Sequence, residues 1–191
     1  MKHTFQKFFL LVFLVSIISC CKDDLPDLNL PAKTAEGLNT LGFIVNERIW
    51  VNYGERCFLF GGCSENKAQA LLIKQPGGIF ELIISGAYTV RGKEVDQSFS
   101  IGGENITTVG IYTLDISKGE KMKFVANRYA HSRKYYVNST QNYPVLVINR
   151  FDTVNNVIAG EFKGILYNPA EPSDIVEIKE GRFDIELEYK K

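Results

Sequence analysis

Apolar and polar residues alternate along much of the chain from Leu41 to its C-terminal end. The alternation is clearest in the last run, in which Phe183, Ile185, Leu187 and Tyr189 alternate with Arg182, Asp184, Glu186 and Glu188. Successive side chains of a β-strand point to opposite faces, so this spacing gives one face to a core and the other to water. The run therefore predicts an amphipathic strand whose acidic residues lie in solvent.

Further runs rich in β-branched and aromatic residues are separated by Gly, Asn, Asp and Pro, which favours short strands joined by turns. The predicted strands cover residues 41–46, 48–53, 68–74, 79–86, 98–103, 109–116, 121–130, 133–139, 144–151, 157–167, 175–178 and 181–190. Asn46 and Glu47 stand at the turn of a hairpin between the first two. The pattern predicts an all-β domain, an antiparallel β-sandwich or barrel-like fold of about 10–12 strands.

The N-terminus has the features of an export signal. Lys2 and Lys7 precede an apolar run, Phe8 to Ile18, that is much shorter than the roughly 20 residues of a membrane-spanning helix. The residues Ile17-Ile18-Ser19-Cys20 resemble a bacterial lipobox, which implies that residues 1–19 are a signal peptide and that Cys20 carries lipid. The alternative is an ordinary secretory signal with incidental cysteines.

The residues after Cys20 suggest a destination. Lys22-Asp23-Asp24 resembles the signal that sends lipoproteins of Bacteroidota to the outer face of the outer membrane, although a solvated tether explains the acids equally well. A diacylated or triacylated cysteine would anchor the chain stably in a membrane. Residues 20–37 are polar and contain Pro26 and Pro31, which predicts a flexible tether before a single domain at 38–191.

Net charge and size limit the classes of partner. Lys2 and Lys7 lie in the signal, so 20 of the 22 basic residues remain against 22 acidic ones, which gives no reason to expect a nucleic-acid partner. A domain of this length can bury a large core and needs no metal to fold. The sequence shows no phosphate-binding glycine loop and predicts no cofactor.

Cys57 and Cys63 enclose a short glycine-containing segment. In an oxidising compartment they can form a local disulfide, and the alternative is a pair of free thiols buried as small apolar residues. Their spacing matches no zinc-ligand pattern, and His131 is the one histidine left after the signal, so no metal site is expected.

Two regions of the chain contain short motifs that can be compared with those of a known family. The first is Leu38 to Asn46, read Leu-Asn-Thr-Leu-Gly-Phe-Ile-Val-Asn, with Trp50 shortly after it. The second comprises a Gly-x-Phe strand at Gly160-Glu161-Phe162 and the sequence Gly181-Arg182-Phe183-Asp184. Both regions resemble a family of Bacteroidota surface lipoproteins of unknown function, which often has Cys at the position of Phe43 and Gly at that of Glu47. The hairpin is therefore expected to be looser or to have another turn type. The resemblance implies a β-rich lipoprotein and brings no catalytic residues.

The densest cluster of aromatic and basic residues is RYAHSRKYY. Its candidate ligand-binding residues are Arg128, Tyr129, His131, Arg133, Tyr135 and Tyr136, which could stack on sugars or bind anionic groups. The alternative is a hairpin in which the tyrosines are ordinary strand residues. The surrounding residues 118–136 are basic and residues 152–188 acidic, so the domain is either electrically polarised or the two segments neutralise each other as neighbouring strands.

Asp152-Thr153-Val154 resembles the tripeptide that Bacteroidota glycosylate on exported proteins, which makes Thr153 a candidate for O-glycosylation. The same residues are typical of a plain turn.

These features together predict a surface-exposed, lipid-anchored binding module and not an enzyme. Its expected ligand is a glycan or a partner protein of the uptake or adhesion machinery. The alternative is a structural or assembly subunit of the envelope without a small ligand, and a hydrolase is the third. No G-x-S-x-G elbow and no Cys-His pairing occurs, and the acids of the last run are more simply explained as a solvated face than as a catalytic pair.

Overall fold

The structure, a computed structural model, describes residues 26–57, 61–90, 95–127 and 133–190. Its strands are β1 (Thr40–Val45), β2 (Arg48–Val51), β3 (Glu55–Cys57), β4 (Cys63–Glu65), β5 (Gln69–Lys74), β6 (Phe80–Val90), β7 (Val95–Glu104), β8 (Gly110–Thr113), β9 (Lys121–Ala126), β10 (Lys134–Val137), β11 (Val145–Asp152), β12 (Val157–Asn168) and β13 (Glu171–Lys190). A 3-10 turn, η1 (Ile116–Lys118), precedes β9. The prediction of an all-β fold is confirmed. Within the described ranges, no helix is long and apolar enough to cross a membrane.

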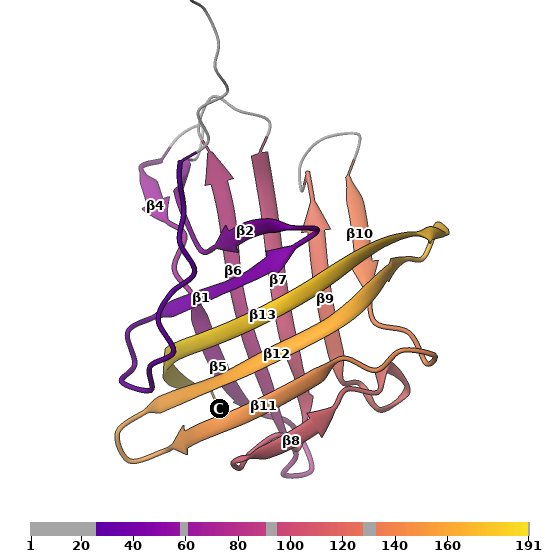
Figure 1. The fold of residues 1–191 in the computed structure, drawn as a ribbon. Helices are drawn as coiled ribbons and strands as arrows, with labels where there is room; N and C mark the ends of the chain where they lie inside the picture. Colours follow the sequence, from indigo (N-terminus) through magenta and orange to yellow (C-terminus); the bar gives the residue numbers. More distant parts are fainter. Residues whose placement is uncertain (1–25, 58–60, 91–94, 128–132, 191) are drawn as a thin grey trace, which may run out of the picture.

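The main strands form two layers that cross at an angle. Strands β5, β6, β7, β9 and β10 lie at the back in Figure 1, and β2, β1, β13, β12, β11 and β8 run diagonally across the front. The layers join at two corners, because β13 pairs with β5 and β10 pairs with β12. The hydrogen bonds therefore run in a closed ring, so the fold is a sandwich with joined corners, a barrel-like arrangement that leaves few open edges.

One corner departs from the predicted antiparallel pattern. The end of β13 runs parallel to β5, with Leu187 opposite Ala70 and Lys190 opposite Ile73. The hairpin rule applied to the sequence could not find this pairing, because the partners are more than a hundred residues apart and no turn connects them.

Strand β13 replaces two strands of the prediction. Its buried side chains occupy even positions at Val176 and Ile178 and odd positions at Phe183 and Ile185. The switch from even to odd buried positions occurs at Glu180, whose φ is +50°. At the same place the pairing of β13 with β1 shifts by one residue. This bulge increases the local twist and lets one strand continue from the front layer to the corner with β5.

The core lies between the layers and is centred on aromatic rings. The ring of Phe43 on β1 stacks against Trp50 of β2 at 4.6 Å and contacts Phe99 of β7 at 4.7 Å between centroids. Phe162 of β12 stacks on Phe99 at 4.9 Å. Because Phe43 and Trp50 belong to the first hairpin, this hairpin is an integral part of the core.

The predicted hairpin between β1 and β2 is present, with Val45 opposite Arg48. Its turn residues Asn46 and Glu47 have φ of +46° and +67°, the left-handed conformation that a two-residue turn of type I′ requires at both positions. The Asn46 side chain accepts a hydrogen bond from the backbone N–H of Glu177 at 3.0 Å. The turn therefore keeps the tight type I′ geometry although Glu47 stands where glycine is the usual choice, and the expectation of a looser hairpin or another turn type is wrong.

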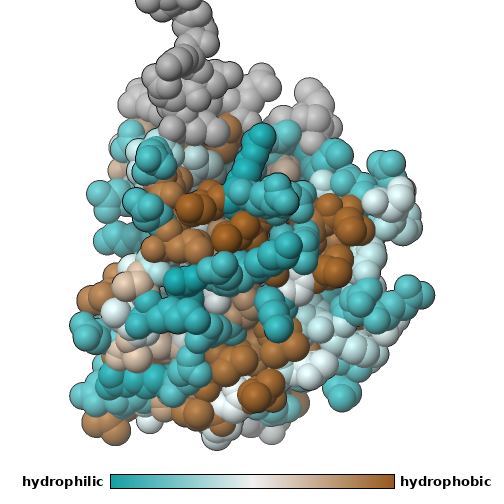
Figure 2. Space-filling view, in the orientation of Figure 1, coloured by the Kyte–Doolittle hydropathy of each residue, from teal (hydrophilic) through white to brown (hydrophobic). Residues whose placement is uncertain are grey.

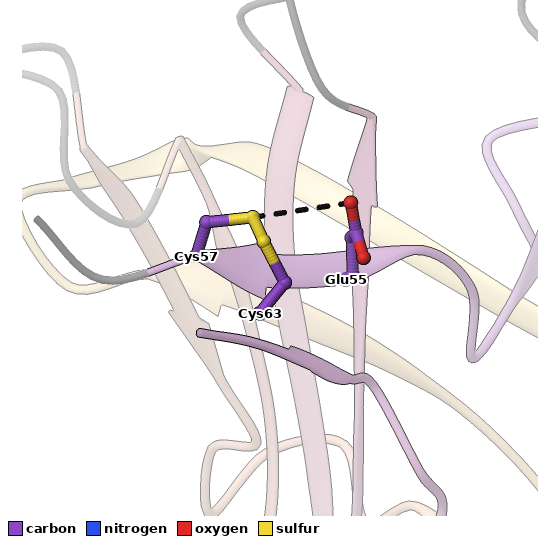
Figure 3. Close-up of a disulfide and its surroundings, with 3 residues drawn as sticks. All are labelled: Glu55, Cys57 and Cys63. Atoms are coloured by element: carbon purple, nitrogen blue, oxygen red, sulfur yellow. Dashed lines mark hydrogen bonds between the residues drawn. A yellow bond between two sulfur atoms is a disulfide. The ribbon is translucent and has the colours of Figure 1, made fainter. Parts of the chain in front are cut away.

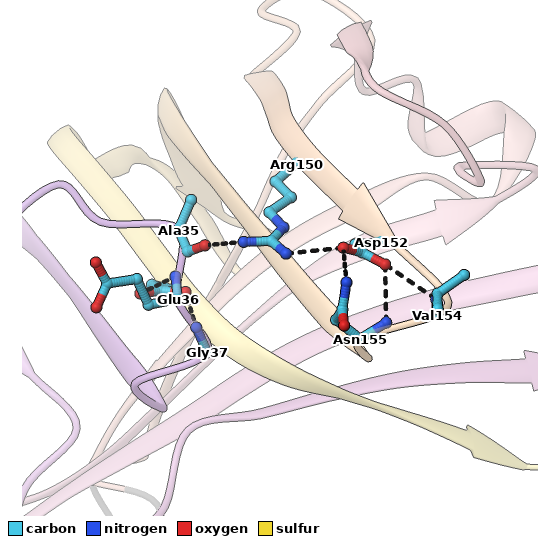
Figure 4. Close-up of polar contacts among 8 residues, drawn as sticks. Ala35, Glu36, Gly37, Arg150, Asp152, Val154 and Asn155 are labelled. Carbon is cyan, nitrogen blue, oxygen red and sulfur yellow. Dashed lines mark hydrogen bonds and ion pairs between the residues drawn. The ribbon is translucent and has the colours of Figure 1, made fainter.

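Residues 26–37, here called the N-terminal strap, pack along the outer face of the front layer. Asp184 of β13 accepts hydrogen bonds from the Thr34 hydroxyl at 2.7 Å and from the backbone N–H groups of Glu36 and Gly37 at 2.9 and 2.6 Å. The guanidinium of Arg150 donates to the carbonyl of Ala35, as Figure 4 shows. The prediction of a flexible tether over residues 20–37 is therefore wrong for the strap, which three strands of the sheet hold in place.

The same contacts correct the prediction for the last strand. Asp184 was expected on a solvated face, but it is 1% exposed, because the strap covers it. Glu186 and Glu188 on the same face are exposed as expected.

Candidate functional site

A small hairpin stands apart from the main sheet. Strands β3 and β4 pair only with each other, and the sulfurs of Cys57 and Cys63 are bonded across them, as Figure 3 shows. Of the two alternatives that the sequence left open, the structure therefore has the disulfide. The Glu55 carboxylate lies 3.9 Å from the Cys57 sulfur, but with both sulfurs bonded to each other this group offers a cation a single carboxylate.

The base of this hairpin is fixed to the end of β6. The backbone N–H of Tyr53 donates to the carbonyl of Ala87, and the N–H of Thr89 donates to the carbonyl of Tyr53, both at 3.0 Å. Asn66, just after β4, donates through its side chain to the Tyr53 carbonyl and through its backbone to Gly54, both at 2.8 Å. A Cβ at Gly54 would lie 1.9 Å from the Thr89 carbonyl oxygen, so only glycine permits this approach.

Between the hairpin and the outer face of the back layer lies a groove of about 560 Å³, within the usual range for ligand sites. Its floor follows from the register of the strands. Ser85 of β6 pairs with Ser100 of β7, which pairs with Lys123 of β9, and Ala87 pairs with Ser98. Small side chains at neighbouring outward positions leave the floor hollow, whereas the inward neighbours on these strands are large core residues.

The walls of the groove are polar and carry an excess of positive charge. Arg56, Lys67 and Lys123 line it together with one acid, Glu65. The ammonium nitrogen of Lys123 lies 4.8 Å from the centre of the Tyr135 ring, a cation–π contact that holds this side chain at the edge of the floor. The groove is thus suited to a polar ligand, and its rim to an anionic one.

The structure separates the two adjacent tyrosines that the sequence grouped as ligand-binding residues. Tyr135 points outward beside Lys123. Tyr136 is buried at 4% exposure, packs against Phe124 in the core, and donates its hydroxyl to Asp174 at 3.2 Å. Burial, and next the Asp174 charge, raises the pKa of Tyr136. Tyr136 is therefore a core residue, and only Tyr135 lies next to the groove.

The other predicted site residues have different positions. Arg133 is exposed just before β10 and does not line the groove. Arg128, Tyr129 and His131 lie outside the described residues. Cys20, Lys22, Asp23 and Asp24 also lie outside them, so the lipid anchor and the export signal stay predictions.

The basic and acidic segments are partly neutralised by one ion pair. Lys134 of β10 lies 2.8 Å from the carboxylate of Asp174 in β13, which also accepts a hydrogen bond from Asn168. The hydrogen bond from Lys134, followed by the one from Asn168, lowers the pKa of the Asp174 carboxyl. The bond between Lys134 and Asp174 also raises the pKa of the Lys134 ammonium. The two segments therefore meet at β10 and β13, where one residue of each sign is neutralised, and Lys123 of the basic segment lines the groove.

Thr153 lies at the exposed turn between β11 and β12, and Figure 4 shows its neighbours Asp152, Val154 and Asn155. Asp152 shapes this turn by accepting hydrogen bonds from the backbone N–H groups of Val154 and Asn155 at 3.0 and 2.8 Å. The pKa of the Asp152 carboxyl lies far below its usual range because the carboxylate accepts several hydrogen bonds. The largest effect comes from the Asn155 side chain, followed by the Asn155 backbone N–H and the Arg150 side chain. The turn is real, and modification of Thr153 stays a prediction.

Sequence reasoning missed the groove. Strands β3 and β4 have three residues each, too few to show a period, and the floor serines belong to two different strands, β6 and β7. Two signals were present: the Cys57 and Cys63 spacing, and small polar residues at Ser85, Ser98 and Ser100 where outward strand positions are usually larger.

A family model described as "Domain of unknown function (DUF5025)" matches residues 93–186. The match runs from β7 into β13, so it includes Ser98, Ser100 and Lys123 of the groove floor but not the disulfide hairpin. Neither a curated protein nor a solved structure matched the chain.

Proposed function

We propose that the protein is a binding module whose site is the groove beneath the hairpin of β3 and β4. The observation that carries the proposal is the floor of serine and alanine side chains on β6 and β7, walled by a hairpin that the Cys57–Cys63 disulfide closes. A rigid scaffold that presents a hollow, polar surface is typical of sites that bind hydroxyl-rich ligands. An oligosaccharide is the ligand class that fits such a surface best.

Binding is favoured over hydrolysis by the distribution of carboxylates. A glycoside hydrolase uses two acids about 5–9.5 Å apart, one of them with a raised pKa. Among the described residues that line the groove, Glu65 is the only acid. The carboxyl groups with a clearly displaced pKa in the described ranges, Asp115, Asp152, Asp174 and Asp184, all have it lowered.

The place of action proposed for this module is the outer face of the outer membrane, with lipid on Cys20. The sequence at Cys20 and at Lys22-Asp23-Asp24 supports this location. Labelling cells with an alkyne-tagged fatty acid tests it. A Cys20→Ser variant should lose the label, and the matched variant Cys21→Ser should keep it. Protease treatment of intact cells then reports surface exposure.

A second candidate is an assembly subunit, and the edge strand β8 favours it. Val109 and Ile111 are 60% and 76% exposed, and Ile111 pairs with Val147 of β11. Figure 2 shows hydrophobic residues on the lower part of this face, where Figure 1 places β11 and β8. An exposed apolar edge suits a protein partner.

The groove is tested by filling it. A thermal-shift screen of the purified protein against plant and host glycans should find a saturable shift of a few degrees for at least one. Ser85→Phe and, independently, Ser98→Tyr should abolish that shift, because both side chains would occupy the hollow floor. Thr113→Phe on β8 is the matched control and should leave it unchanged. Unaltered binding in both filled variants, or no shift with any glycan, would reject the groove as a glycan site.

A further inference from the structure

The charge of the groove narrows the class of ligand, given that the groove binds an oligosaccharide as proposed above. Three cationic side chains and one acid line it, so its net charge is positive, although the whole chain is formally neutral. Charge of one sign concentrated at a concave site favours ligands of the opposite sign and speeds their association.

Lys67 and Lys123 are available to a ligand. No carboxylate among the described residues pairs with either, and Lys123 contacts the neutral ring of Tyr135. Three lysines elsewhere in the described chain have acidic partners, Lys33 with Glu161, Lys134 with Asp174 and Lys179 with Glu177, whereas Lys67 and Lys123 combine the lack of such a partner with a place in the groove. An ammonium without a protein counter-ion at the rim of a groove is placed to bind an incoming carboxylate.

The neutral polar side chains of the groove favour a ligand that carries hydroxyl groups in addition to a carboxylate. Ser85, Ser98 and Ser100 present hydroxyls on the floor, and Gln69 adds an amide at the wall. These groups both donate and accept hydrogen bonds, as the hydroxyls of a sugar ring do. We propose that the groove selects acidic oligosaccharides, with sugar hydroxyls on the serine floor and a ring carboxylate at Lys123.

Three soluble probes separate the parts of this proposal. Tetragalacturonate carries ring hydroxyls and carboxylates, its fully methyl-esterified form keeps the hydroxyls but loses the charges, and tetraglutamate keeps the charges but lacks the rings. Calorimetric titration of the purified protein should give binding to tetragalacturonate about tenfold tighter than to either other probe, since a hydrogen bond to a charged group is worth roughly one to two powers of ten. The advantage should shrink as salt is added.

Variants on one strand provide the matched control. Lys123→Gln should bring the affinity for tetragalacturonate close to that for the ester and leave affinity for the ester unchanged. Lys121→Gln, two residues away on the same face of β9 and outside the groove, should leave both affinities at the wild-type value. Lys67→Gln repeats the test at the opposite wall.

The outcomes distinguish selection for an acidic ligand from glycan binding in the groove. Equal binding of acid and ester, abolished by Ser85→Phe, would overturn the charge selection and leave the groove as a glycan site. Equal binding of tetraglutamate and tetragalacturonate would overturn recognition of the sugar and point to an acidic peptide. Binding of none of the probes would overturn the acidic oligosaccharide, and the glycan screen would then decide the fate of the groove itself.

Discussion

The carboxylate of Asp184 accepts a hydrogen bond of 2.6 Å from the backbone N–H of Gly37, 147 residues earlier in the chain. This contact fastens the N-terminal strap across the last strand and leaves Asp184 buried. A side chain near the C-terminus therefore holds residues 34–37 against the sheet.

Asp184→Asn should destabilise the protein by about 3 kcal/mol, because an amide replaces one of the two oxygens that accept from the strap and leaves buried N–H groups unsatisfied. The melting temperature should fall by roughly 10 °C. Denaturant unfolding measures the change. Glu186→Gln, at the next outward and exposed position of β13, is the control and should shift stability by less than about 0.5 kcal/mol. Equal effects of the two variants would contradict the role of the strap.

The stability contributed by Asp184 should depend on pH. Burial acts to raise the pKa of its carboxyl, but the hydrogen bonds from Glu36, Thr34, Gly37 and Leu38 outweigh burial, and the pKa lies below its ordinary value. Because the folded pKa is below the unfolded pKa of about 3.9, the contribution is present above pH 4 and is lost as the pH falls through the folded pKa. The stability difference between wild type and Asp184→Asn should therefore be constant from pH 7 to pH 5 and narrow below pH 4. A difference that stays constant down to pH 2 would count against this assignment.

Reduction of the Cys57–Cys63 bond should loosen the hairpin and spare the core. The chain-entropy model assigns so short a loop about 2 kcal/mol. Hydrogen exchange should accelerate at the backbone N–H of Asn66, which bonds to the Gly54 carbonyl at the base of the hairpin. Amides in the centre of β6 should exchange as before. A cysteine-free double variant, Cys57→Ser with Cys63→Ser, should reproduce the effect without reductant, and unchanged exchange at Asn66 would show that the disulfide does not order the groove wall.

Glu47→Gly should stabilise the protein by about 1 kcal/mol, because glycine adopts φ of +67° without the steric cost that glutamate bears. Asn46→Gly is the informative comparison. This variant also removes the steric cost of a positive φ, but it loses the hydrogen bond that the Asn46 side chain accepts from the Glu177 N–H. Its effect on stability should therefore be neutral or destabilising. Urea unfolding midpoints of the two variants decide the matter, and a loss of stability in Glu47→Gly would argue against a type I′ turn.

The neighbouring tyrosines should respond differently to truncation. Tyr136→Ala removes a buried ring from the core and should cost about 3–4 kcal/mol. Tyr135→Ala removes an outward ring beside Lys123 and should change stability by less than about 1 kcal/mol. It should also weaken the binding of any ligand that Lys123 contacts. Thermal unfolding and calorimetric titration measure the two properties separately. Similar losses of stability in both variants would refute the assignment of opposite faces.

The amino-acid sequence by itself determined the strand class and most strand positions. Alternation over two residues is a local property, and runs such as that before Leu187 reveal it without knowledge of any partner. The turn at Asn46 and Glu47 was also predictable from the local sequence alone. Local patterns also raised the Cys57 and Cys63 pairing, although spacing alone could not choose between the disulfide and free thiols.

Only the tertiary structure decided which strands become neighbours and what covers each face. The parallel pairing of β13 with β5, the burial of Asp184 and the choice of Tyr135 over Tyr136 as the tyrosine beside the groove all depend on contacts between different strands. Alternation says that a residue lies on the second face of a strand, but it cannot say whether water, a strap or a ligand covers that face. The groove exists because β6 and β7 place small residues side by side beneath the hairpin of β3 and β4, and no single segment of the sequence contains that arrangement.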